Sequence, residues 1–332
     1  MKKITIKEIA KITGVSSATV SRVLNDNGRF SEETRKKVLD AIEKFEYRPN
    51  VVAKSLRTSR SKTIGVIVPD ITNEFFAHIV LAIENLCVPR GYSVFICNTS
   101  ESEEKEKMYI KDLEAKGVDG LICLSGIMDV PADVTRQQIP VVCIDRKPNN
   151  QHVIMVESDN VTGGYLATEE LIKKGCQKIV MLRDERGVSP MQNRYVGYQQ
   201  ALADYGLPLD KNLVINVQVD VFSAKRAITE LIQAGVAFDG VFAGTDWLAF
   251  GALMALKEHH VQVPEQVKIV GFDNITVSQF SSPAITTIHQ DKAKMGETAA
   301  KVLLDIIDNG LDHVKTRNIT LPIELIRRET TG

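Results

Sequence analysis

In residues 5–45, apolar residues recur at roughly helical spacing in three short segments, which predicts three helices. A capping box opens the first helix at Thr5–Glu8, and apolar residues then recur at roughly helical spacing until Gly14 stops it. Ser16 is placed to cap a second helix and Ser31 a third. The first part of the chain is therefore expected to be a small all-α unit.

The pattern changes at Lys62. Ile64–Val68 is a continuous apolar run, as expected of a buried parallel strand, and strand-like runs then alternate with helical segments as far as Gly271. Strands are predicted at 64–68, 92–97, 118–124, 139–144, 178–182, 213–217, 240–243 and 267–271, and helices at 74–90, 103–116, 163–174, 193–205, 223–234 and 246–259. Such alternation is typical of doubly wound α/β folds, and the number of strands fits two lobes better than one sheet.

Charge divides the chain at the same place. Residues 1–62 hold 15 Lys and Arg against 7 Asp and Glu, a net charge of +8, whereas the remainder holds 26 against 35, a net charge of −9. A small basic head on an acidic body suggests a polyanion as the partner of the head. A merely solvated basic surface is the alternative, and charge alone does not decide between them.

No membrane or secreted location is indicated. The chain has no run of about 18 apolar residues, and its basic start is followed by a charged helix pattern rather than an apolar core. The odd number of cysteines and the absence of a C-x-x-C pair favour reduced cysteines buried in a core. These five are Cys87, Cys97, Cys123, Cys143 and Cys176. We expect a cytoplasmic protein.

The spacing of helix, Gly14-centred turn and helix is the signal of a helix-turn-helix. The second helix is then expected in the DNA major groove, with Arg22 as a natural bidentate partner for guanine. The residues expected at DNA are Ser17, Ala18 and Thr19 early in that helix, Arg22 on its outer side, and Ser16, Ser21 and Asn25 as phosphate contacts. A three-helix scaffold for protein contacts is the alternative.

Several motifs of this region together resemble the lactose/galactose repressor family. They are Gly14-Val15-Ser16, Ala18-Thr19-Val20-Ser21-Arg22-Val23-Leu24-Asn25, Tyr47-Arg48-Pro49-Asn50 and Ala53-Lys54-Ser55-Leu56. The resemblance continues to the C-terminus and so covers nearly the whole chain. It implies a homodimeric transcription repressor that reads the two half-sites of a pseudo-palindromic operator and is controlled by a small-molecule effector.

The resemblance also gives a role to residues 50–56. In that family the segment is a hinge that becomes helical on operator DNA, pairs with its copy in the minor groove and wedges a leucine between base pairs. Leu56 matches that leucine and Ala53 lies one turn earlier. A marginal helix that orders only when its partner and DNA supply contacts is physically reasonable. Without the resemblance, Leu56 reads as an ordinary apolar linker residue.

The changes in sequence pattern and charge described above, together with the resemblance, predict three parts of the chain. Residues 1–48 form the helix-turn-helix DNA-binding domain, 49–61 the hinge and linker, and 62–332 an α/β, two-lobed domain of the periplasmic-binding-protein type, with two doubly wound parallel sheets, that binds the effector and dimerises. Lobe 1 is expected at about 62–160 and 291–320, and lobe 2 at about 161–290 and 321–332. No heptad tail follows, so no tetramer built on such a tail is expected.

Polar and aromatic residues follow the predicted strands. Ligands of two-lobed α/β proteins bind between the lobes at the carboxyl ends of the strands, where such residues gather. The candidates are Asn73, Phe75, Phe76, Asp145, Arg146, Arg194, Phe222, Asp246, Asp273 and Gln290. Aromatic faces and paired donors and acceptors suit a sugar. Taken singly, each residue also reads as core, as a helix cap or as part of an ion pair.

The same positions resemble the sugar site of the periplasmic ribose-binding-protein group, with Asp246 in place of that group's asparagine. The resemblance implies a ribose-like monosaccharide, and sucrose-type regulators stay possible. Purine effectors fit less well. A catabolite-control regulator with a phosphocarrier protein as partner is a further alternative, weakened because Gly271–Phe280 contains no arginine where that partner would bind.

Three functions of other classes are less well supported. A dehydrogenase or other enzyme would show a G-x-G-x-x-G, G-x-x-x-x-G-K-[ST], H-E-x-x-H or G-x-S-x-G motif, and the sequence has none in the required context. A transport sugar-binding protein would carry a signal peptide and no helix-turn-helix. A purely structural module does not explain the polar strand ends. No cofactor and no metal site are expected.

Overall fold

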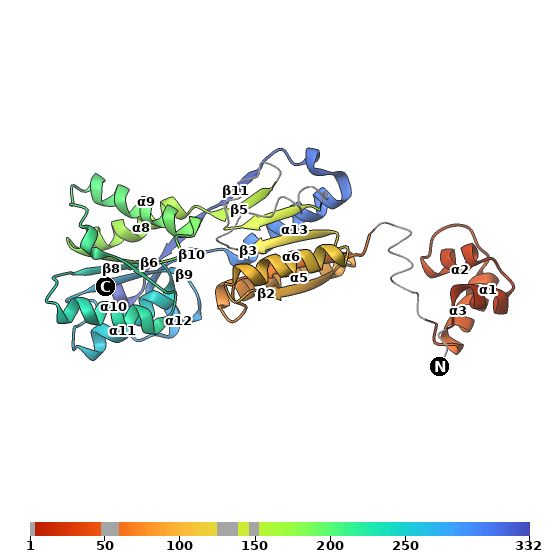
Figure 1. The fold of residues 1–332 in the computed structure, drawn as a ribbon, viewed down its shortest axis with the longest axis horizontal. Coiled ribbons are helices and arrows are strands. Elements are labelled where there is room, and N and C mark those ends of the chain that lie inside the picture. The colour runs from red at the N-terminus through yellow and green to blue at the C-terminus, as the bar shows by residue number, and fades with distance from the viewer. Residues whose placement is uncertain (1–3, 48–59, 125–138, 146–152) are drawn as a thin grey trace. The chain divides into compact units, whose positions relative to one another are not determined.

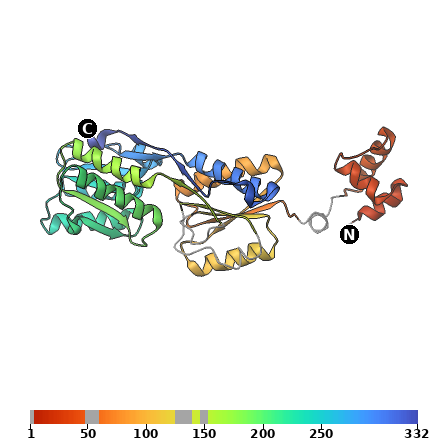
Figure 2. The ribbon, with the colours of Figure 1, turned by 90° about the horizontal axis from the view of Figure 1, so that it is seen from above.

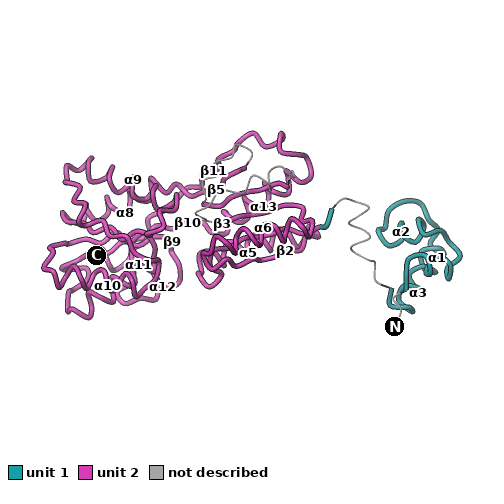
Figure 3. Tube along the Cα trace, viewed as in Figure 1, with its two compact units in different colours: residues 1–61 teal, residues 62–332 magenta. Residues whose placement is uncertain are grey.

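The computed structural model describes residues 4–47, 60–124, 139–145 and 153–332. The chain divides into two compact units, Met1–Ser61 and Lys62–Gly332 (Figure 3). The predicted hinge at residues 50–56 lies outside the described residues.

The described residues of the first unit form three helices. They are α1 (Ile6–Thr13), α2 (Ser17–Leu24) and α3 (Glu32–Lys44). The capping box at the start of α1 is present, since the Glu8 carboxylate accepts from the Thr5 backbone N–H at 2.7 Å. Gly14 ends α1 in the left-handed conformation with φ 71°, which glycine adopts without a steric penalty. Ser16 and Ser31 cap the next two helices.

The core of the first unit is a single cluster to which all three helices contribute. Its buried members are Ile9, Ala10, Val20, Val23, Val38 and Tyr47. These residues recur at helical spacing, so one face of each helix is apolar and the opposite face is left for solvent or a ligand.

In the part of the second unit that the structure describes, the strands form two six-stranded sheets. The first has the order β11-β5-β4-β3-β1-β2 and the second β12-β10-β9-β8-β6-β7. The first contains β1 (Thr63–Val68), β2 (Ser93–Asn98), β3 (Gly120–Leu124), β4 (Val141–Ile144), β5 (Ile154–Ser158) and β11 (Asn318–Leu321). The second contains β6 (Ile179–Asp184), β7 (Val214–Val217), β8 (Gly240–Ala243), β9 (Lys268–Asp273), β10 (Thr286–Gln290) and β12 (Ile323–Ile326). We call the parts built on these sheets lobe 1 and lobe 2.

Helices cover both faces of each sheet (Figures 1 and 2). In lobe 1, α5 (Glu74–Cys87) and α13 (Lys292–Asn309) pack together on one face and α6 (Glu103–Ala115) lies on the other. In lobe 2, α10 (Val221–Gln233) and α11 (Asp246–Glu258) cover one face, and α8 (Asn160–Lys173) and α9 (Ser189–Asp204) the other. The short helix α12 (Thr276–Phe280) follows β9. Single 3₁₀ turns lie at Val88–Arg90, Lys211–Leu213, Leu311–His313 and Glu329–Thr331.

The chain passes between the lobes three times, between β5 and α8, between β10 and α13, and between β11 and β12. In the last crossing only Pro322 separates the two strands. β11 pairs with β5 in parallel, whereas β12 pairs with β10 antiparallel. This reversal follows if the carboxyl ends of the two sheets face each other across the gap between the lobes. A chain that runs nearly straight through β11 and β12 then points toward the gap in the first sheet and away from the gap in the second. The second sheet is therefore parallel except for this edge strand.

The alternation of strands and helices predicted from sequence is confirmed as two α/β lobes after a helical head. The structure adds to this pattern and differs from it in detail. The sequence did not predict β5, nor the elements after β9, which are α12, β10, α13, β11 and β12, and α9 begins at Ser189 rather than at Asn193. Pro190 in the first turn of α9 explains the earlier start, since proline has the backbone angle of a helix and its missing N–H is not needed there.

Candidate functional site

A cleft of about 120 Å³ lies between the two lobes at the carboxyl ends of their strands. Residues that follow β1, β2 and β4 line it from lobe 1, and residues that follow β6, β7, β8 and β9 line it from lobe 2. The cleft brings together six of the residues predicted from sequence. They are Asn73, Phe75, Phe76, Asp145, Arg194 and Asp273.

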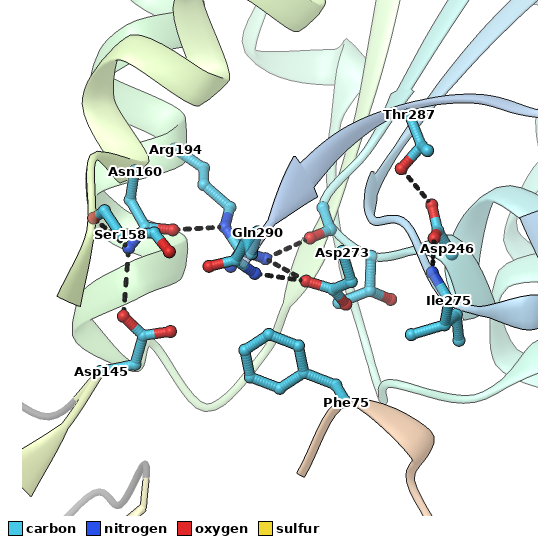
Figure 4. A network of polar contacts seen from close by, with 12 residues as sticks. Phe75, Asp145, Ser158, Asn160, Arg194, Asp246, Asp273, Ile275, Thr287 and Gln290 are labelled. Atoms are coloured by element: carbon cyan, nitrogen blue, oxygen red, sulfur yellow. Dashed lines mark hydrogen bonds and ion pairs between the residues drawn. The ribbon is translucent and has the colours of Figure 1, made fainter. Parts of the chain in front are cut away.

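Arg194 is the central polar group of the cleft (Figure 4). Its side chain comes from the second turn of α9 and is almost fully buried. The guanidinium donates from Nε to Asn160 Oδ1 at 2.8 Å and from Nη1 to the Gly244 carbonyl at 2.6 Å, and it lies 3.7 Å from Asp273 Oδ1. Its Cζ also lies 3.6 Å from the centroid of the Phe272 ring. The guanidinium is therefore held in one orientation.

The Asn160 side chain connects Arg194 to lobe 1. Its amide donates to the Ser158 carbonyl at 3.0 Å and toward Asp145 Oδ1 at 3.4 Å, while its oxygen accepts from Arg194. Asn160 begins α8, directly after the first crossing between the lobes. A displacement of one lobe against the other therefore acts directly on this chain of contacts.

Asp273 is held at a second crossing. Gln290 Nε2 donates to Asp273 Oδ1 at 2.7 Å, and Lys292 Nζ donates to the Asp273 carbonyl at 2.5 Å. Asp273 has a φ of 105° and Asn274 a φ of 52°, which are unusual values for residues with side chains and mark a strained turn. The Gln290 Oε1 atom is buried and accepts no hydrogen bond within the described part of the chain.

Burial governs the charges of the cleft. It raises the pKa of the Asp145 carboxyl to about 7, against the attraction of Arg194, and raises the pKa of Asp273 in the same way. Burial also lowers the pKa of the Arg194 guanidinium, although Asp273 and Asp145 oppose this. Carboxyl groups poised in this way both accept and donate hydrogen bonds, which suits the hydroxyl groups of an uncharged ligand.

Phe75 and Phe76 supply the apolar surface of the site. Both lie in the first turn of α5, which Asn73 caps by accepting from the Phe75 backbone N–H at 3.1 Å. Their rings meet edge to face, with centroids 5.3 Å apart. Phe75 points into the space between Asp145 and Asp273 (Figure 4). A flat ring between two carboxyl groups is an arrangement that fits a sugar.

Three of the predicted residues that the structure describes are not on the wall of the cleft. Phe222 is 79% exposed on α10, and Gln290 supports Asp273 from behind. Asp246 is fully buried, and its carboxylate accepts from the Ile275 N–H at 2.8 Å and from the Thr287 hydroxyl at 2.6 Å instead of facing the cleft. Arg146 lies outside the described residues.

The sequence reasoning missed several residues of the wall. Among them are Glu101 after β2, Asp184 and Arg186 at the end of β6, and Thr245 before α11, while Asn160 is a buried link behind it. The rule that polar residues at strand ends gather in one cleft applies to these positions as well. The prediction included only Arg194 after β6 and no residue after β2.

The exposed side of α2 is the candidate nucleic-acid interface. Ala18, Arg22 and Asn25 are exposed and follow one another at helical spacing, opposite the buried Val20 and Val23. Ser17 is partly exposed beside them. An exposed arginine on a helix whose other face is packed meets the steric requirement for reading a DNA groove.

Several predicted DNA contacts also hold the local fold. The Ser16 hydroxyl accepts from the Thr19 N–H at 3.0 Å, and its oxygen lies 2.9 Å from Thr19 Oγ1. Asn25 Nδ2 donates to the Ser21 carbonyl at 2.6 Å. These groups are therefore fixed around the ends of α2. Ala53 and Leu56 lie outside the described residues.

Comparison with protein families matches both units. Residues 5–50 match the model described as bacterial regulatory proteins, lacI family, and residues 61–329 match periplasmic binding proteins and sugar binding domain of LacI family. The second match alone covers most of the chain. The chain belongs to the LacI family of bacterial regulatory proteins.

Curated relatives of this LacI-family chain span its whole length. It is 36% identical over 329 residues to the HTH-type transcriptional regulator RegA of Clostridium saccharobutylicum, which covers 98% of each chain. It is 35% identical over 327 residues to a ribose operon repressor of Halalkalibacterium halodurans, which covers 98% of this chain and 97% of the relative. Other relatives carry the name PurR.

Solved structures of the family share the fold. A lac repressor dimer bound to operator and the anti-inducer ONPF aligns with a TM-score of 0.87 at 26% identity and covers 99% of each chain. A LacI family transcriptional regulator from Enterococcus faecium with bound ribose aligns with a TM-score of 0.74 at 32% identity and covers 81% of this chain and 98% of that one.

The family assignment decides between the function classes. The chain is a DNA-binding transcriptional regulator with a sugar-binding-type domain, and the enzyme alternative is excluded because its curated relatives are transcriptional regulators and repressors. Within the described residues no helix is long and apolar enough to cross a membrane. The same residues contain no group of three or more side chains suited to hold a metal ion.

Proposed function

We propose that this chain is an operator-binding repressor that a ribose-like monosaccharide, bound between the lobes, releases from DNA. The observation that carries the proposal is the buried network around Arg194, which joins the two lobes through Asn160 and lies beside the acids Asp145 and Asp273. A ligand that bonds to this network makes contacts with both lobes at once, and so its binding energy favours one arrangement of the lobes.

The chemistry of the cleft supports an uncharged polyol. Arg194 donates, Asp145 and Asp273 exchange hydrogen bonds with hydroxyls, and Phe75 and Phe76 cover a ring face. The proposed set of effector-binding residues also includes Arg146, Phe222, Asp246 and Gln290. Asp246 and Gln290 act from behind the wall of the cleft, and Phe222 acts from the lobe 2 side. A bound ribose in the regulator from Enterococcus faecium, which has the same fold, agrees with this choice.

On the DNA side, we propose that Arg22 reads a guanine while Ser17, Ala18 and Thr19 contact neighbouring bases. Ser16, Ser21 and Asn25 then contact phosphates. Two copies of the chain would read the two halves of a pseudo-palindromic operator, by analogy with the lac repressor dimer on its operator. Ala53 and Leu56 belong to the proposed hinge, residues 49–61, which joins the DNA-binding domain at 1–48 to the effector domain at 62–332.

A repressor must reach its operator on the bacterial DNA, so we propose that this protein is located in the cytoplasm. No resident cofactor has a role in the proposed mechanism.

A thermal-shift screen tests the proposed ligand class. A ligand that binds only the folded protein raises the melting temperature, by an amount equivalent to about 2.7 kcal/mol at a hundredfold excess over the dissociation constant. D-ribose, D-fructose, D-glucose, sucrose, ribose 5-phosphate, guanine and hypoxanthine are the probes. A shift with ribose or another free monosaccharide supports the proposal, and a shift only with purines or phosphates contradicts it.

The purine outcome has some support of its own because several relatives carry the name PurR. Such an outcome would keep the family and the DNA-binding function and would replace the sugar chemistry of the cleft.

A further inference from the structure

Three charged side chains form a row across the cleft that the proposed sugar contacts do not use. Glu101 follows β2 in lobe 1, whereas Asp184 and Arg186 lie at the end of β6 in lobe 2. Arg186 donates from Nε to Asp184 Oδ1 at 2.9 Å and from Nη2 to Asp184 Oδ2 at 2.6 Å. Its Nη1 forms an ion pair with Glu101 Oε1. The row therefore joins one lobe to the other.

The row runs from the interior of the protein to the solvent. The exposed fraction of the side chain rises from 3% for Asp184 to 26% for Arg186 and 44% for Glu101. All three residues line the same cleft as Arg194 and Asp273. Because Arg194 and Asp273 are almost fully buried, the Arg186–Glu101 pair lies at the outer end of the cleft and the proposed sugar contacts at the inner end.

Both ends of the row are fixed by the backbone. Ser100 and Glu101 have φ values of 51° and 62°, which side-chain-bearing residues adopt only at a cost of about 1–3 kcal/mol each, and the Glu101 N–H donates to the Pro69 carbonyl at 3.2 Å. On the other side the Arg186 N–H donates to Asp184 Oδ1 at 2.9 Å. A strained turn in lobe 1 and a side-chain-capped turn in lobe 2 thus position the charges of Glu101 and Arg186 opposite each other.

The Arg186 guanidinium is directed at protein groups rather than at the ligand space. Its Nε, Nη1 and Nη2 atoms all bond to the two carboxylates, so it forms a wall more than a binding group. The cleft that these residues line measures about 120 Å³, below the roughly 300–1,000 Å³ of pockets for drug-sized ligands. The space is suited to one ring.

We propose that Arg186, held between Asp184 and Glu101, is a specificity-determining residue that closes the cleft behind a single sugar ring and excludes disaccharides. The inference rests on the proposed function, since it specifies the size of the ligand in the same cleft. Its basis is the position of the charged row, because none of the proposed sugar contacts belongs to that row.

Calorimetric titration of the full chain with D-ribose, D-glucose, sucrose, maltose and cellobiose tests the inference. The variants are Arg186→Ala, which removes the wall, and Glu101→Gln, which keeps the Asp184–Arg186 pair and removes only the charge that joins the lobes. Arg183→Ala is the matched control, because Arg183 lies in β6 three residues before Arg186 but bonds to Gln192 at 2.8 Å and stacks on Tyr195.

Wild type and Arg183→Ala should bind a monosaccharide and discriminate against every disaccharide. In Arg186→Ala and Glu101→Gln the ratio of disaccharide to monosaccharide dissociation constants should fall at least about tenfold, which is within the range that pocket shape alone controls. A general loss of stability would weaken both classes of sugar and leave this ratio unchanged. If Arg186→Ala does not fold, Glu101→Gln decides the question, because it preserves the buried pair.

An unchanged ratio in Glu101→Gln and Arg186→Ala overturns the inference, and so does a wild type that binds a disaccharide as tightly as a monosaccharide. Failure of the proposed function gives a different result, because then the wild type binds none of the sugars. That result overturns the inference together with the proposed function.

Discussion

Asp246 has no exposed surface, and both of its carboxyl oxygens are engaged by protein groups. Its place after β8 was correctly inferred from the sequence, but the direction of its side chain was not available there. As the first residue of α11 it turns toward the Ile275 N–H and the Thr287 hydroxyl, which belong to segments about 30 and 40 residues further along the chain. Sequence position predicts which residues come near a cleft, whereas tertiary partners decide which of them face it.

The charge of Asp246 predicts a pH dependence of stability. Burial, with Asp273 nearby, raises the pKa of Asp246 to about 8, and burial raises that of Asp145 to about 7. A carboxyl whose pKa is raised by folding stabilises the protein most below its unfolded pKa of about 4, and this contribution is lost as pH rises through its folded pKa. Between pH 6 and pH 8.5 the melting temperature of the wild type should therefore fall.

Asp246→Asn should reduce that fall. The amide oxygen of Asn still accepts from the Ile275 N–H, its nitrogen donates to the Thr287 hydroxyl, and no buried charge forms at high pH. We expect the advantage of Asp246→Asn over the wild type to be larger at pH 8.5 than at pH 6 by on the order of 1–2 kcal/mol, equivalent to about 2–6 °C. Calorimetric melting curves at both pH values measure this, with the exposed Asp312→Asn as control. An identical pH slope in Asp246→Asn and wild type would show that Asp246 carries no such penalty.

Among the elements, α2 presents the surface that is predicted to read DNA. The exposed positions Ala18, Arg22 and Asn25 follow from the hydrophobic spacing of Val20 and Val23, so this face was predictable from sequence. The Ser16 cap was also predicted and is present, whereas the sequence pattern does not reveal that the Asn25 side chain bonds to the Ser21 carbonyl at the other end of the helix.

Arg22→Ala should lower operator affinity by about 1–3 kcal/mol and reduce the preference for operator over unrelated DNA. The control is Arg29→Ala, since Arg29 is also exposed in the head but lies beyond α2. Its loss should weaken binding to both kinds of DNA to a similar, smaller extent. Fluorescence anisotropy with labelled operator and a scrambled duplex of equal length measures both values. Equal losses on the two duplexes for Arg22→Ala would contradict a base-reading role.

The close crossing of α8 and α9 positions the centre of the cleft. A Cβ on Gly164 would lie 2.1 Å from the Arg194 carbonyl oxygen, and a Cβ on Gly197 would lie 2.0 Å from the Val161 carbonyl oxygen. The two helices therefore approach each other at a distance that only glycine permits, and this brings Arg194 within reach of Asn160. Nothing in the helical pattern of the sequence distinguishes these glycines from others.

Gly197→Ala should push α9 away from α8 and displace Arg194. We expect a loss of stability of about 1–3 kcal/mol, the usual cost of overpacking, together with a sugar affinity at least tenfold weaker. Gln200→Ala, an exposed position on the same helix, should change neither quantity appreciably. Calorimetric unfolding and titration with D-ribose measure the two effects. Undiminished ribose affinity in Gly197→Ala would show that the crossing does not set the geometry of the site.

At the scale of the whole molecule, the two lobes and their alternation of strands and helices were predictable, because buried strands are apolar runs and helices are periodic. The path of the chain between the lobes was predictable only in part. The straight passage through β11, Pro322 and β12, with its switch from parallel to antiparallel pairing, depends on how the two sheets face each other. That relation is long-range and leaves no local pattern in the sequence.

The central claim is that one ligand in the cleft changes the affinity of the head for DNA. If so, the coupling is reciprocal, so that sugar weakens operator binding by the same factor by which operator weakens sugar binding. Arg194→Ala should break the coupling by abolishing the sugar response, while ligand-free protein keeps its affinity for DNA.

The most direct measurement is the operator dissociation constant of the wild type and of Arg194→Ala, by fluorescence anisotropy, with and without saturating D-ribose. For the wild type we predict that ribose weakens operator binding at least about tenfold, equivalent to about 1.4 kcal/mol of coupling. For Arg194→Ala the two values should be equal. Operator binding by the wild type that stays the same or becomes tighter with ribose would contradict the account.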